Sequence, residues 1–232
     1  TNGTVLSKSC VQTDETADVI AQLQNGEFYI QGMASQKAVE LLDAKPNDVI
    51  VDVCACPGGK TLGAAIDMKN DGVVYSFDLH ANKLPLIEKS AKILGIDIIK
   101  TEKHDARFVR DQLIGIADRV ICDVPCSGTG VMGSKPEIKY KSLDSLSGLP
   151  EIQYNILCNA SKYVKPSGIL VYSTCTINSS ENESVVKRVL SEHPEIYLSE
   201  DTYIFNNKCG EYTFLPHVDN TDGFYIAVLK KR

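Results

Sequence analysis

The chain has 232 residues, of which 43% are hydrophobic and 23% are charged, with a formal net charge of −6 at pH 7. This balance is that of one large globular domain that can bury a core without disulfide bonds. No apolar run reaches the roughly 18 residues that a membrane span needs, and no signal peptide opens the chain. The net charge has the wrong sign for a general nucleic-acid binder, so affinity for nucleic acid requires a local basic patch or another domain.

The chain begins with Thr1 rather than Met, which predicts a fragment of a longer protein. We interpret residues 1–30 as an irregular lead-in from a missing N-terminal region, and residues 31–232 as one domain. Several of the eight cysteines lie inside apolar, strand-like runs, as is typical of free cysteines in a cytoplasmic protein. We therefore expect a cytoplasmic monomer that has no membrane anchor.

From residue 31 onward, strand-like apolar runs alternate with segments of helical spacing. In chain order we predict helix 33–44, strand 49–55, helix 60–68, strand 73–78, helix 84–95, strand 96–100, a short helix near 106–114, strand 119–124, a polar loop over 125–149, helix 150–164, strand 168–174, helix 181–193 and strand 223–231. This alternation indicates an α/β, Rossmann-like fold with a mostly parallel sheet and helices on both faces. In such sheets the ligand binds beyond the carboxyl ends of the strands.

A glycine-containing run joins the first strand to the next helix: Cys54-Ala55-Cys56-Pro57-Gly58-Gly59-Lys60. Adjacent glycines let the backbone approach a ligand closely, and the helix that follows offers unpaired N–H groups. The run is neither the G-x-G-x-x-G dinucleotide fingerprint nor a G-x-x-x-x-G-K-[ST] phosphate loop. It predicts a cofactor loop, although an ordinary strand-to-helix turn has the same local features.

Two carboxylates follow the next two strands. Asp78 ends the second strand, where a carboxylate can accept hydrogen bonds from ribose hydroxyls. Asp105 follows the third strand and can face an adenine amino group. Each aspartate alone is weak evidence, because aspartate is common in turns and at helix N-caps. Together with the glycine run they predict an adenosine-containing cofactor, and the lack of a phosphate loop favours S-adenosylmethionine over ATP or NAD.

Two cysteines follow the fourth and fifth strands. Cys126 lies in a Pro-Cys motif and Cys175 in a Thr-Cys motif. If these strands are neighbours in the sheet, both thiols emerge side by side on the ligand side. Inert packing is the commoner role of a cysteine at a strand end.

Two other roles for the cysteines are less well supported. Cys54-x-Cys56 and Cys122-x3-Cys126 are pairs, but zinc ribbons usually have C-x2-C spacing, so we predict no metal site. A Cys-His hydrolase would need a histidine beside the nucleophile. The sequence shows no evident cysteine partner for any of the four histidines, which are His80, His104, His193 and His217.

Three motifs occur in order, at residues 54–61, 123–130 and 173–176. Together they resemble the signature motifs of the Sun/Fmu family of RNA cytosine-5 methyltransferases, and they are most like those of the bacterial 16S ribosomal RNA enzymes. Further residues and segments resemble the same family: Gln31, Ser35-Gln36, 135–140, 178–183 and 222–225. The resemblance covers about residues 25–232.

The resemblance implies a Rossmann-like, S-adenosylmethionine-dependent methyltransferase that acts on cytosine carbon-5 in RNA, with 16S ribosomal RNA as the expected substrate. It implies that Cys175 is the nucleophile that adds to carbon-6, and that Cys126 assists release of the product. Asp123 is expected to contact the cytosine edge near the cofactor. The expected cofactor-binding residues are Cys54, Ala55, Cys56, Pro57, Gly58, Gly59, Lys60, Asp78, Asp105 and Asp123. Lys60 can instead have a structural role at the start of its helix.

Attack on carbon-6 requires an unstacked base, so the target cytosine must be single-stranded or flipped out. The loop after Cys126 offers four residues that form either an RNA-facing patch or a solvated lysine loop: Lys135, Lys139, Tyr140 and Lys141. The resemblance also implies an additional N-terminal RNA-binding domain. The sequence departs from the family at Cys56, where alanine is usual, and at 132–135, where paired arginines are frequent. The second departure weakens the case for RNA contacts there.

Two other functions remain open. A DNA cytosine-5 methyltransferase would use Cys126 as the nucleophile, because those enzymes carry it in a Pro-Cys motif. The Thr-Cys motif favours the RNA reaction. A catalytically silent RNA-binding assembly factor would retain the fold without the chemistry, and the presence of both Cys126 and Cys175 argues against it.

Overall fold

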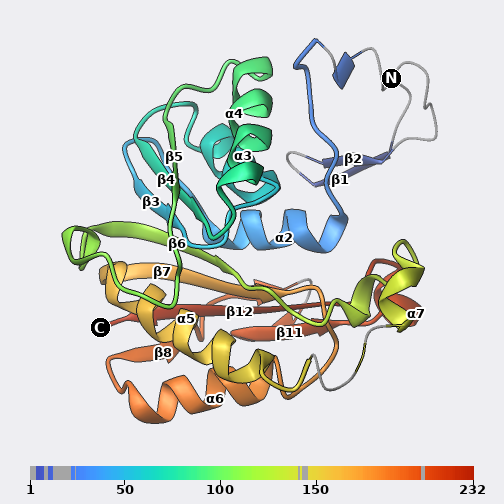
Figure 1. Ribbon diagram of the computed structural model, residues 1–232, viewed down its shortest axis with the longest axis vertical. Helices are drawn as coiled ribbons and strands as arrows, with labels where there is room; N and C mark the ends of the chain where they lie inside the picture. The colour runs from blue at the N-terminus through green and yellow to red at the C-terminus, as the bar shows by residue number, and fades with distance from the viewer. Residues whose placement is uncertain are drawn as a thin grey trace.

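The computed structural model describes residues 4–7, 10–12, 22–23, 25–140, 142, 146–204 and 207–232. The strands of the main sheet are β3 (Val49–Asp52), β4 (Val73–Asp78), β5 (Ile99–Lys103), β6 (Ala117–Asp123), β7 (Val164–Thr174), β8 (Ile196–Leu198), β11 (Glu211–Phe214) and β12 (Phe224–Lys231). Within the described residues they form one eight-stranded sheet in the order β11-β12-β7-β6-β3-β4-β5, and β8 also pairs with β12 (Figure 1). Strands β3 to β7 run parallel, whereas β8, β11 and β12 pair antiparallel.

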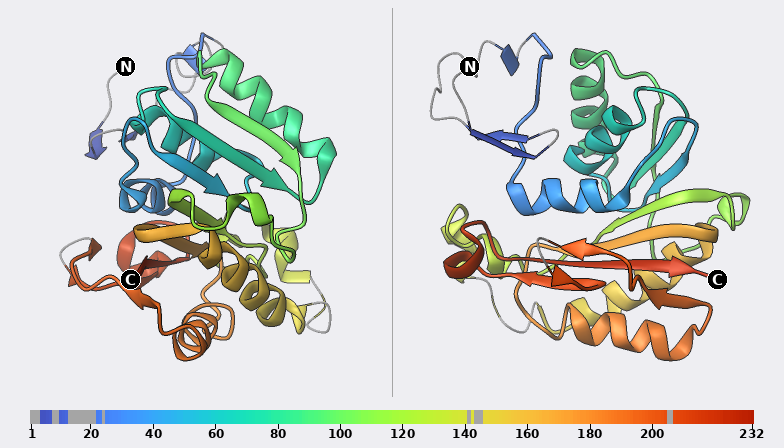
Figure 2. Two further views of the ribbon diagram at one scale, coloured as in Figure 1. Left: turned by 90° about the vertical axis from the view of Figure 1, so that its left-hand side faces the viewer. Right: turned by 180° about the vertical axis from the view of Figure 1, so that it is seen from behind.

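Helices cover both faces of this sheet. The α-helices are α2 (Met33–Leu42), α3 (Gly59–Asp67), α4 (Leu84–Ile93), α5 (Leu149–Tyr163), α6 (Glu183–Glu192) and α7 (Pro216–Asp219). Leu42, Leu62 and Ala91 of α2, α3 and α4 belong to one hydrophobic cluster. Leu157 and Val186 of α5 and α6 belong to a second cluster, on the opposite face (Figures 1 and 2). The predicted α/β fold, with a mostly parallel sheet between two helical layers, is confirmed.

The parallel register brings the ends of the central strands together. Asp52 at the end of β3 pairs with Ser76 of β4 and with Ile121 of β6. Asp123 at the end of β6 pairs with Ser173 of β7. Since parallel strands share one carboxyl edge, the loops that follow β3, β4, β6 and β7 all open on the same side of the sheet.

The strand predicted at 96–100 was misplaced, because β5 begins at Ile99. The backbone N–H of Ile96 donates to the Ala91 carbonyl at 2.8 Å, and Gly95 has a positive φ of 68°. Residues 95 and 96 therefore close the end of α4 in a glycine-capped turn, and the strand follows that turn.

The helix predicted near 106–114 is also wrong: this stretch contains only a 3-10 turn, η2 (Asp111–Leu113). Asp105 accepts hydrogen bonds from the backbone N–H and the guanidinium of Arg107. A side chain that binds the backbone two residues on replaces the first helical turn with an Asx turn. The apolar spacing of this stretch does not reveal that competition.

Several segments predicted to be loops, or given no predicted structure, contain short helical turns or strands. The predicted loop 125–149 contains two 3-10 turns, η3 (Thr129–Val131) and η4 (Pro136–Tyr140), and a third, η1 (Ala81–Lys83), precedes α4. Residues 194–222 supply β8, β11 and the two-stranded pair β9 (Tyr203–Ile204) and β10 (Asn207–Lys208), none of which was predicted. Within residues 1–30, β1 (Thr4–Ser7) and β2 (Cys10–Gln12) pair antiparallel, so this segment is not irregular throughout, whereas residues 25–30 form no helix or strand.

Candidate active site

The loop after β3 is fixed on one side by β4 and on the other by α4. The backbone N–H of Ala55 donates to the Phe77 carbonyl at 2.7 Å, which ties the loop to the neighbouring strand. Gly58 has a positive φ of 112°, and a Cβ there would lie 3.0 Å from Cγ1 of Ile87 on α4. Only glycine takes this conformation readily, and α3 starts at the next residue.

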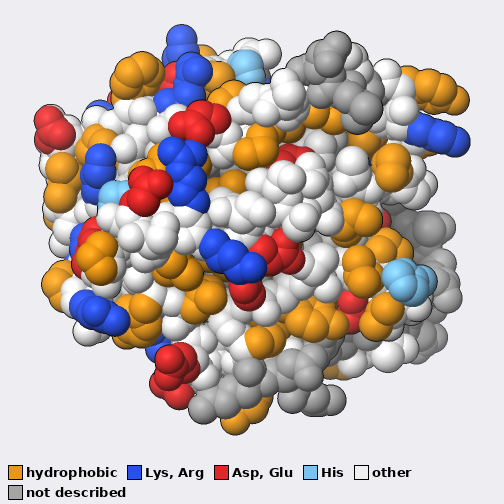
Figure 3. Space-filling view, turned by 90° about the horizontal axis from the view of Figure 1, so that it is seen from below, with side chains coloured by type: hydrophobic (Ala, Val, Ile, Leu, Met, Phe, Trp, Pro, Cys, Tyr) orange, Lys and Arg blue, Asp and Glu red, His pale blue; other side chains and the backbone are white. Residues whose placement is uncertain are grey.

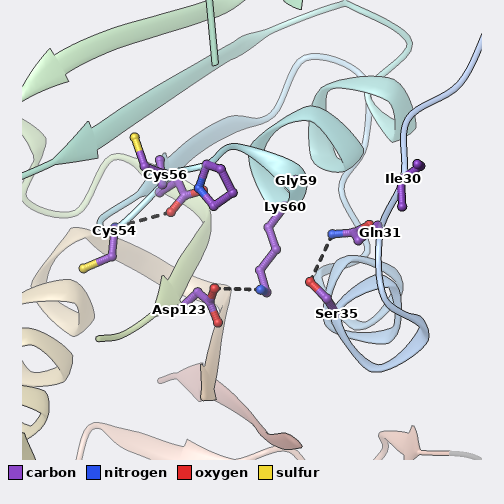
Figure 4. Close-up of a pocket in the computed structure, with 11 residues that line it drawn as sticks. Ile30, Gln31, Ser35, Cys54, Cys56, Gly59, Lys60 and Asp123 are labelled. Atoms are coloured by element: carbon purple, nitrogen blue, oxygen red, sulfur yellow. Dashed lines mark hydrogen bonds and ion pairs between the residues drawn. The ribbon is translucent and has the colours of Figure 1, made fainter. Parts of the chain in front are cut away.

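A pocket with a volume of about 160 Å³ opens between this loop, the start of α2 and the end of β6 (Figure 4). Its lining residues are Ile30, Gln31, Ser35, Asp52, Cys54, Ala55, Cys56, Pro57, Gly59, Lys60 and Asp123. Most of the predicted loop residues therefore line one cavity together with Asp123. Gly58, Asp78 and Asp105 lie outside the lining. The side chain of Gln31 faces Gly59, where an added Cβ would lie 3.2 Å from Nε2.

Four of the lining residues had no predicted role in the site. Ile30 and Asp52 were not singled out, and Gln31 and Ser35 were noted only through their resemblance to a family. Gln31 donates through Nε2 to the Ser35 hydroxyl at 3.1 Å, which joins the segment before α2 to its first turn. The position of Asp52 at the end of the first strand was the available signal.

The two other predicted aspartates have different surroundings. Asp78 is buried, and its carboxylate accepts the backbone N–H groups of Cys56 at 3.2 Å and His80 at 2.9 Å. It therefore connects the cofactor loop to the end of β4. Asp105 forms an ion pair with Arg107, and that hydrogen-bonded guanidinium lowers the pKa of the Asp105 carboxyl. Asp105 lies in a turn beside the sheet edge rather than in the pocket wall.

Asp52 is a buried acid in the wall of the pocket. Its side chain is 1% exposed and accepts a hydrogen bond of 2.6 Å from the Thr61 hydroxyl of α3. Burial raises the pKa of this carboxyl from 3.8 to about 7, and the bond from Thr61 opposes that shift. Near neutral pH the carboxyl can thus be protonated or charged.

Lys60 and Asp123 join the cofactor loop to the cysteine-bearing strand ends. The ammonium group of Lys60 lies 2.7 Å from the Asp123 carboxylate, as the dashed line in Figure 4 shows. The Ser173 hydroxyl donates to the other oxygen of Asp123 at 2.6 Å. The Asp123 carboxylate is therefore held in one orientation between a cation on α3 and a hydroxyl on β7.

The two cysteines predicted to lie side by side do so. The sulfur atoms of Cys126 and Cys175 are 3.2 Å apart, and both side chains are half-buried. A thiol that donates a hydrogen bond stabilises a neighbouring thiolate. The bond from Cys126 accordingly lowers the pKa of Cys175, and Lys60 lowers it further, while the same bond raises the pKa of Cys126. Cys175 is the member of the pair that is suited to be a nucleophile.

Two other cysteines near the site have the opposite character. Burial raises the pKa of the thiols of Cys54 and Cys122 well above the usual value. Among the described residues, no group of three or more His, Cys, Asp or Glu side chains is arranged to hold a metal ion. His104 lies 2.9 Å from the Phe108 carbonyl and His193 lies 3.5 Å from Glu195, so both face other partners.

The turns that carry the two cysteines are in close backbone contact. The N–H of Gly130 donates to the Cys175 carbonyl at 3.0 Å, and the N–H of Gly223 donates to the Gly130 carbonyl at 2.9 Å. A Cβ on Gly130 would lie 1.9 Å from the Gly223 carbonyl oxygen, so any side chain there would force the segments apart. The glycine of this motif is explained by backbone packing.

Of the residues predicted to face RNA, Lys139 and Tyr140 lie on η4, and Lys135 directly precedes it. Lys135, Lys139 and Tyr140 are exposed, and Ile138 is buried between them, near Gly128. Lys141 lies outside the described residues. By contrast, the face that carries α5 and α6 shows acidic and basic side chains next to one another, with Arg188 paired to Glu151 and Glu192 (Figure 3). Among the residues that the structure describes, that face offers no continuous basic surface.

The fold and site define a class before any particular family is considered. A mixed sheet with a glycine loop after its first parallel strand and acidic residues at successive strand ends is the Rossmann-like methyltransferase fold. Residues 39–230 match the family model described as "16S rRNA methyltransferase RsmB/F", and the chain belongs to that family.

Individual relatives agree with this assignment. The chain is 41% identical over 223 residues to a probable ribosomal RNA small subunit methyltransferase B of Bacillus subtilis, covering 90% of the chain and 49% of that protein. It is 34% identical to a tRNA (cytosine(72)-C(5))-methyltransferase of Pyrococcus horikoshii, covering 90% of the chain and 53% of that protein. The crystal structure of NSun6 from Pyrococcus horikoshii with SFG has a TM-score of 0.80 and 32% identity, covering 90% of the chain and 54% of that structure. The chain thus spans about half the length of these relatives.

None of the helices in the described ranges combines the length and the hydropathy that crossing a membrane requires.

Proposed function

We propose that this protein transfers a methyl group from S-adenosylmethionine to carbon-5 of a cytosine in RNA, through a covalent bond between Cys175 and the base. The observation that carries the proposal is the 3.2 Å pair of Cys126 and Cys175 at two neighbouring strand ends. Relatives named as RNA cytosine-C5 methyltransferases support the reaction, and the family match supports 16S ribosomal RNA as the substrate.

The pocket and the adjoining end of β4 suit an adenosine-containing methyl donor. Gly59 keeps the wall open opposite Gln31, and the carboxylate of Asp78 retains lone pairs that can accept ribose hydroxyls. The proposed cofactor contacts are residues 54–60, Asp78 and Asp123, with Asp105 at the adenine end. When it is bound, S-adenosylmethionine supplies an electrophilic methyl group on its sulfonium.

Cys175 starts the reaction on the base. Its thiolate adds to carbon-6 of cytosine, which makes the ring an enamine whose carbon-5 is nucleophilic. Once carbon-5 carries the methyl group, its proton must leave, and the electron pair of that C–H bond then expels the Cys175 thiolate from carbon-6. We assign assistance of this release to Cys126, because its sulfur is the neighbour of the departing sulfur.

Asp123 and Lys60 orient the base and set the local charge. Asp123 contacts the cytosine edge, and the Lys60 ammonium beside it offsets the negative charge that develops at ring nitrogen 3 as the thiolate adds. The bonds from Lys60 and Ser173 hold the Asp123 carboxylate in place before the substrate arrives. The positive charge of Lys60 also favours the thiolate form of Cys175.

The substrate cytosine must be flipped out or single-stranded, since attack on carbon-6 comes from above the ring. We propose Lys135, Lys139, Tyr140 and Lys141 as RNA contacts on the loop after Cys126. Residues 31–232 are the proposed catalytic domain, acting as a cytoplasmic monomer, and an N-terminal RNA-binding region would supply the affinity that a net charge of −6 does not favour.

The proposal is tested by methyl transfer from labelled S-adenosylmethionine to RNA and to DNA of the same sequence. We expect the labelled methyl group to be stably incorporated into RNA and to be found in 5-methylcytosine after the RNA is digested. Label in DNA alone would identify a DNA cytosine-5 methyltransferase. Label in neither, from protein that binds RNA, would identify a catalytically silent binding protein.

A further inference from the structure

Two buried polar residues at the start of α6 touch the turns of both cysteines. Glu181 is 1% exposed and Asn182 is not exposed at all. Neither lines the pocket. A buried carboxylate and a buried amide are costly unless their hydrogen bonds are satisfied, so the partners of these two side chains indicate what they are for.

Glu181 is bonded to the turn of Cys126 on both sides of that residue. One oxygen of its carboxylate accepts the backbone N–H of Ser127 at 2.9 Å. The same oxygen accepts Nε2 of Gln153 at 2.9 Å, and that amide group also donates to the Pro125 carbonyl at 3.0 Å. The residues before and after Cys126 are thus fixed, one through Gln153 and one directly.

Asn182 is bonded to the turn of Cys175 in the same way. Its Oδ1 accepts the Thr174 hydroxyl at 2.6 Å, and its Nδ2 donates to the Thr176 carbonyl at 3.0 Å. Asn182 is the N-cap residue of α6, where an asparagine side chain usually accepts a backbone N–H of the first turn. It makes no such bond here, and its Oδ1 accepts the Thr174 hydroxyl instead.

We propose that Glu181 and Asn182 are positioning residues that together set the distance between the thiols of Cys126 and Cys175. Adjacent residues share one peptide unit, so the two turns are held to a single rigid point at the start of α6. This inference rests on the proposed function for its meaning in catalysis, but the thiol geometry can be measured without RNA.

The hydrogen bonds predict what each substitution does. Glu181→Gln replaces one carboxylate oxygen by an NH₂ group. If the NH₂ group takes the place of the first oxygen, it faces the donors of Ser127 and Gln153. If it takes the place of the other oxygen, it faces the amide of Asn178, which donates to that oxygen at 3.1 Å. Asn182→Asp keeps an acceptor for Thr174 but directs an oxygen at the Thr176 carbonyl. Both changes are isosteric, and both displace one thiol from the other.

Alkylation of Cys175 by iodoacetamide, followed by mass spectrometry from pH 6 to 10, reads the thiol pair directly. The wild-type midpoint should lie below that of an ordinary cysteine, because Cys126 donates to the Cys175 thiolate. Both variants should shift it upward by about one pH unit or more. Glu183→Gln is the matched control: it removes the same charge two residues away, but its bond goes to Thr213 of β11. Its midpoint should equal that of wild type.

In the methylation assay with RNA, Glu181→Gln should accumulate the covalent complex, because it misplaces Cys126 and slows release. Asn182→Asp should form less of that complex. If Glu181→Gln does not fold, as judged by thermal melting, Gln153→Met removes the link to Pro125 and carries the same test. If the variants fold and their alkylation profiles coincide with that of wild type, the positioning role is wrong. If the alkylation profiles of the variants shift but the wild-type protein transfers no methyl group, the proposed function is overturned and the positioning role stands.

Discussion

The ammonium group of Lys60 lies 2.7 Å from the carboxylate of Asp123, and this ion pair joins the cofactor loop to the strand end beside the two cysteines. Lys60 is at the start of α3, whereas Asp123 ends β6. Because Lys60 also lowers the pKa of Cys175, one cation affects both the carboxylate proposed to contact the base and the thiol proposed to attack it.

Lys60→Met should therefore reduce kcat/KM for methyl transfer by roughly 10- to 100-fold, while the protein remains folded. The Cys175 alkylation midpoint should rise in the same variant. Lys45→Met is the control, since Lys45 pairs with Asp43 in the exposed turn that follows α2. A Lys60→Met enzyme with wild-type kcat/KM would leave Lys60 with only a structural role at the start of its helix.

Asp78→Ala should weaken binding of S-adenosylhomocysteine by roughly 10- to 100-fold, the effect of losing one or two charge-assisted hydrogen bonds. The substitution also frees the backbone N–H groups of Cys56 and His80. Isothermal titration calorimetry measures the change, and Asp71→Ala, in an exposed turn, is the control. Unchanged affinity in Asp78→Ala would move the ribose site away from β4.

The raised pKa of Asp52 should make the free energy of unfolding depend on pH. Its folded-state pKa of about 7 lies above its ordinary value of 3.8, so between these values the folded protein holds a proton that the unfolded chain releases. Stability should therefore fall as pH rises from about 4 to about 7 and be unaffected by this group above that range. The full effect is on the order of 4 kcal/mol.

Asp52→Asn should remove this dependence, because an amide does not titrate. Urea unfolding of wild type and variant at several pH values between 5 and 8 measures the difference in their free energies of unfolding. The stability of wild type relative to Asp52→Asn should decrease up to about pH 7 and then level off. Asp97→Asn, on the surface, controls for the change in formal charge. A constant difference across this range would mean that Asp52 titrates elsewhere.

The central sheet and the edge that carries the site were predictable from the sequence. Alternating strands and helices indicate parallel strands, and the carboxyl ends of parallel strands meet at one edge. Cys126 and Cys175 follow neighbouring strands at this edge, so their proximity was predictable. The 54–60 loop follows β3 at the same edge, and most of it lines the pocket.

Other features depend on tertiary contacts that local patterns do not contain. Ile96 has the apolar character of a strand residue, but its N–H closes the end of α4. Asp105 binds Arg107 and prevents the helix that the apolar spacing of 106–114 favours. The local sequence around Glu181 and Asn182 is typical of a polar helix start. Their hydrogen bonds to the cysteine turns form only when α5, β6 and β7 pack around them.

The account is tested most directly by the covalent RNA complex of the two cysteine variants on denaturing gels, with labelled RNA and S-adenosylmethionine present. Cys175→Ala should abolish both methylation and the complex, because no thiolate remains to attack carbon-6. Cys126→Ala should still attack and transfer the methyl group, but release should stall, so a denaturation-resistant complex should accumulate. Cys158→Ala, on α5, is the control and should behave as wild type. A complex formed by Cys175→Ala but not by Cys126→Ala would contradict the assignment of Cys175 as the nucleophile.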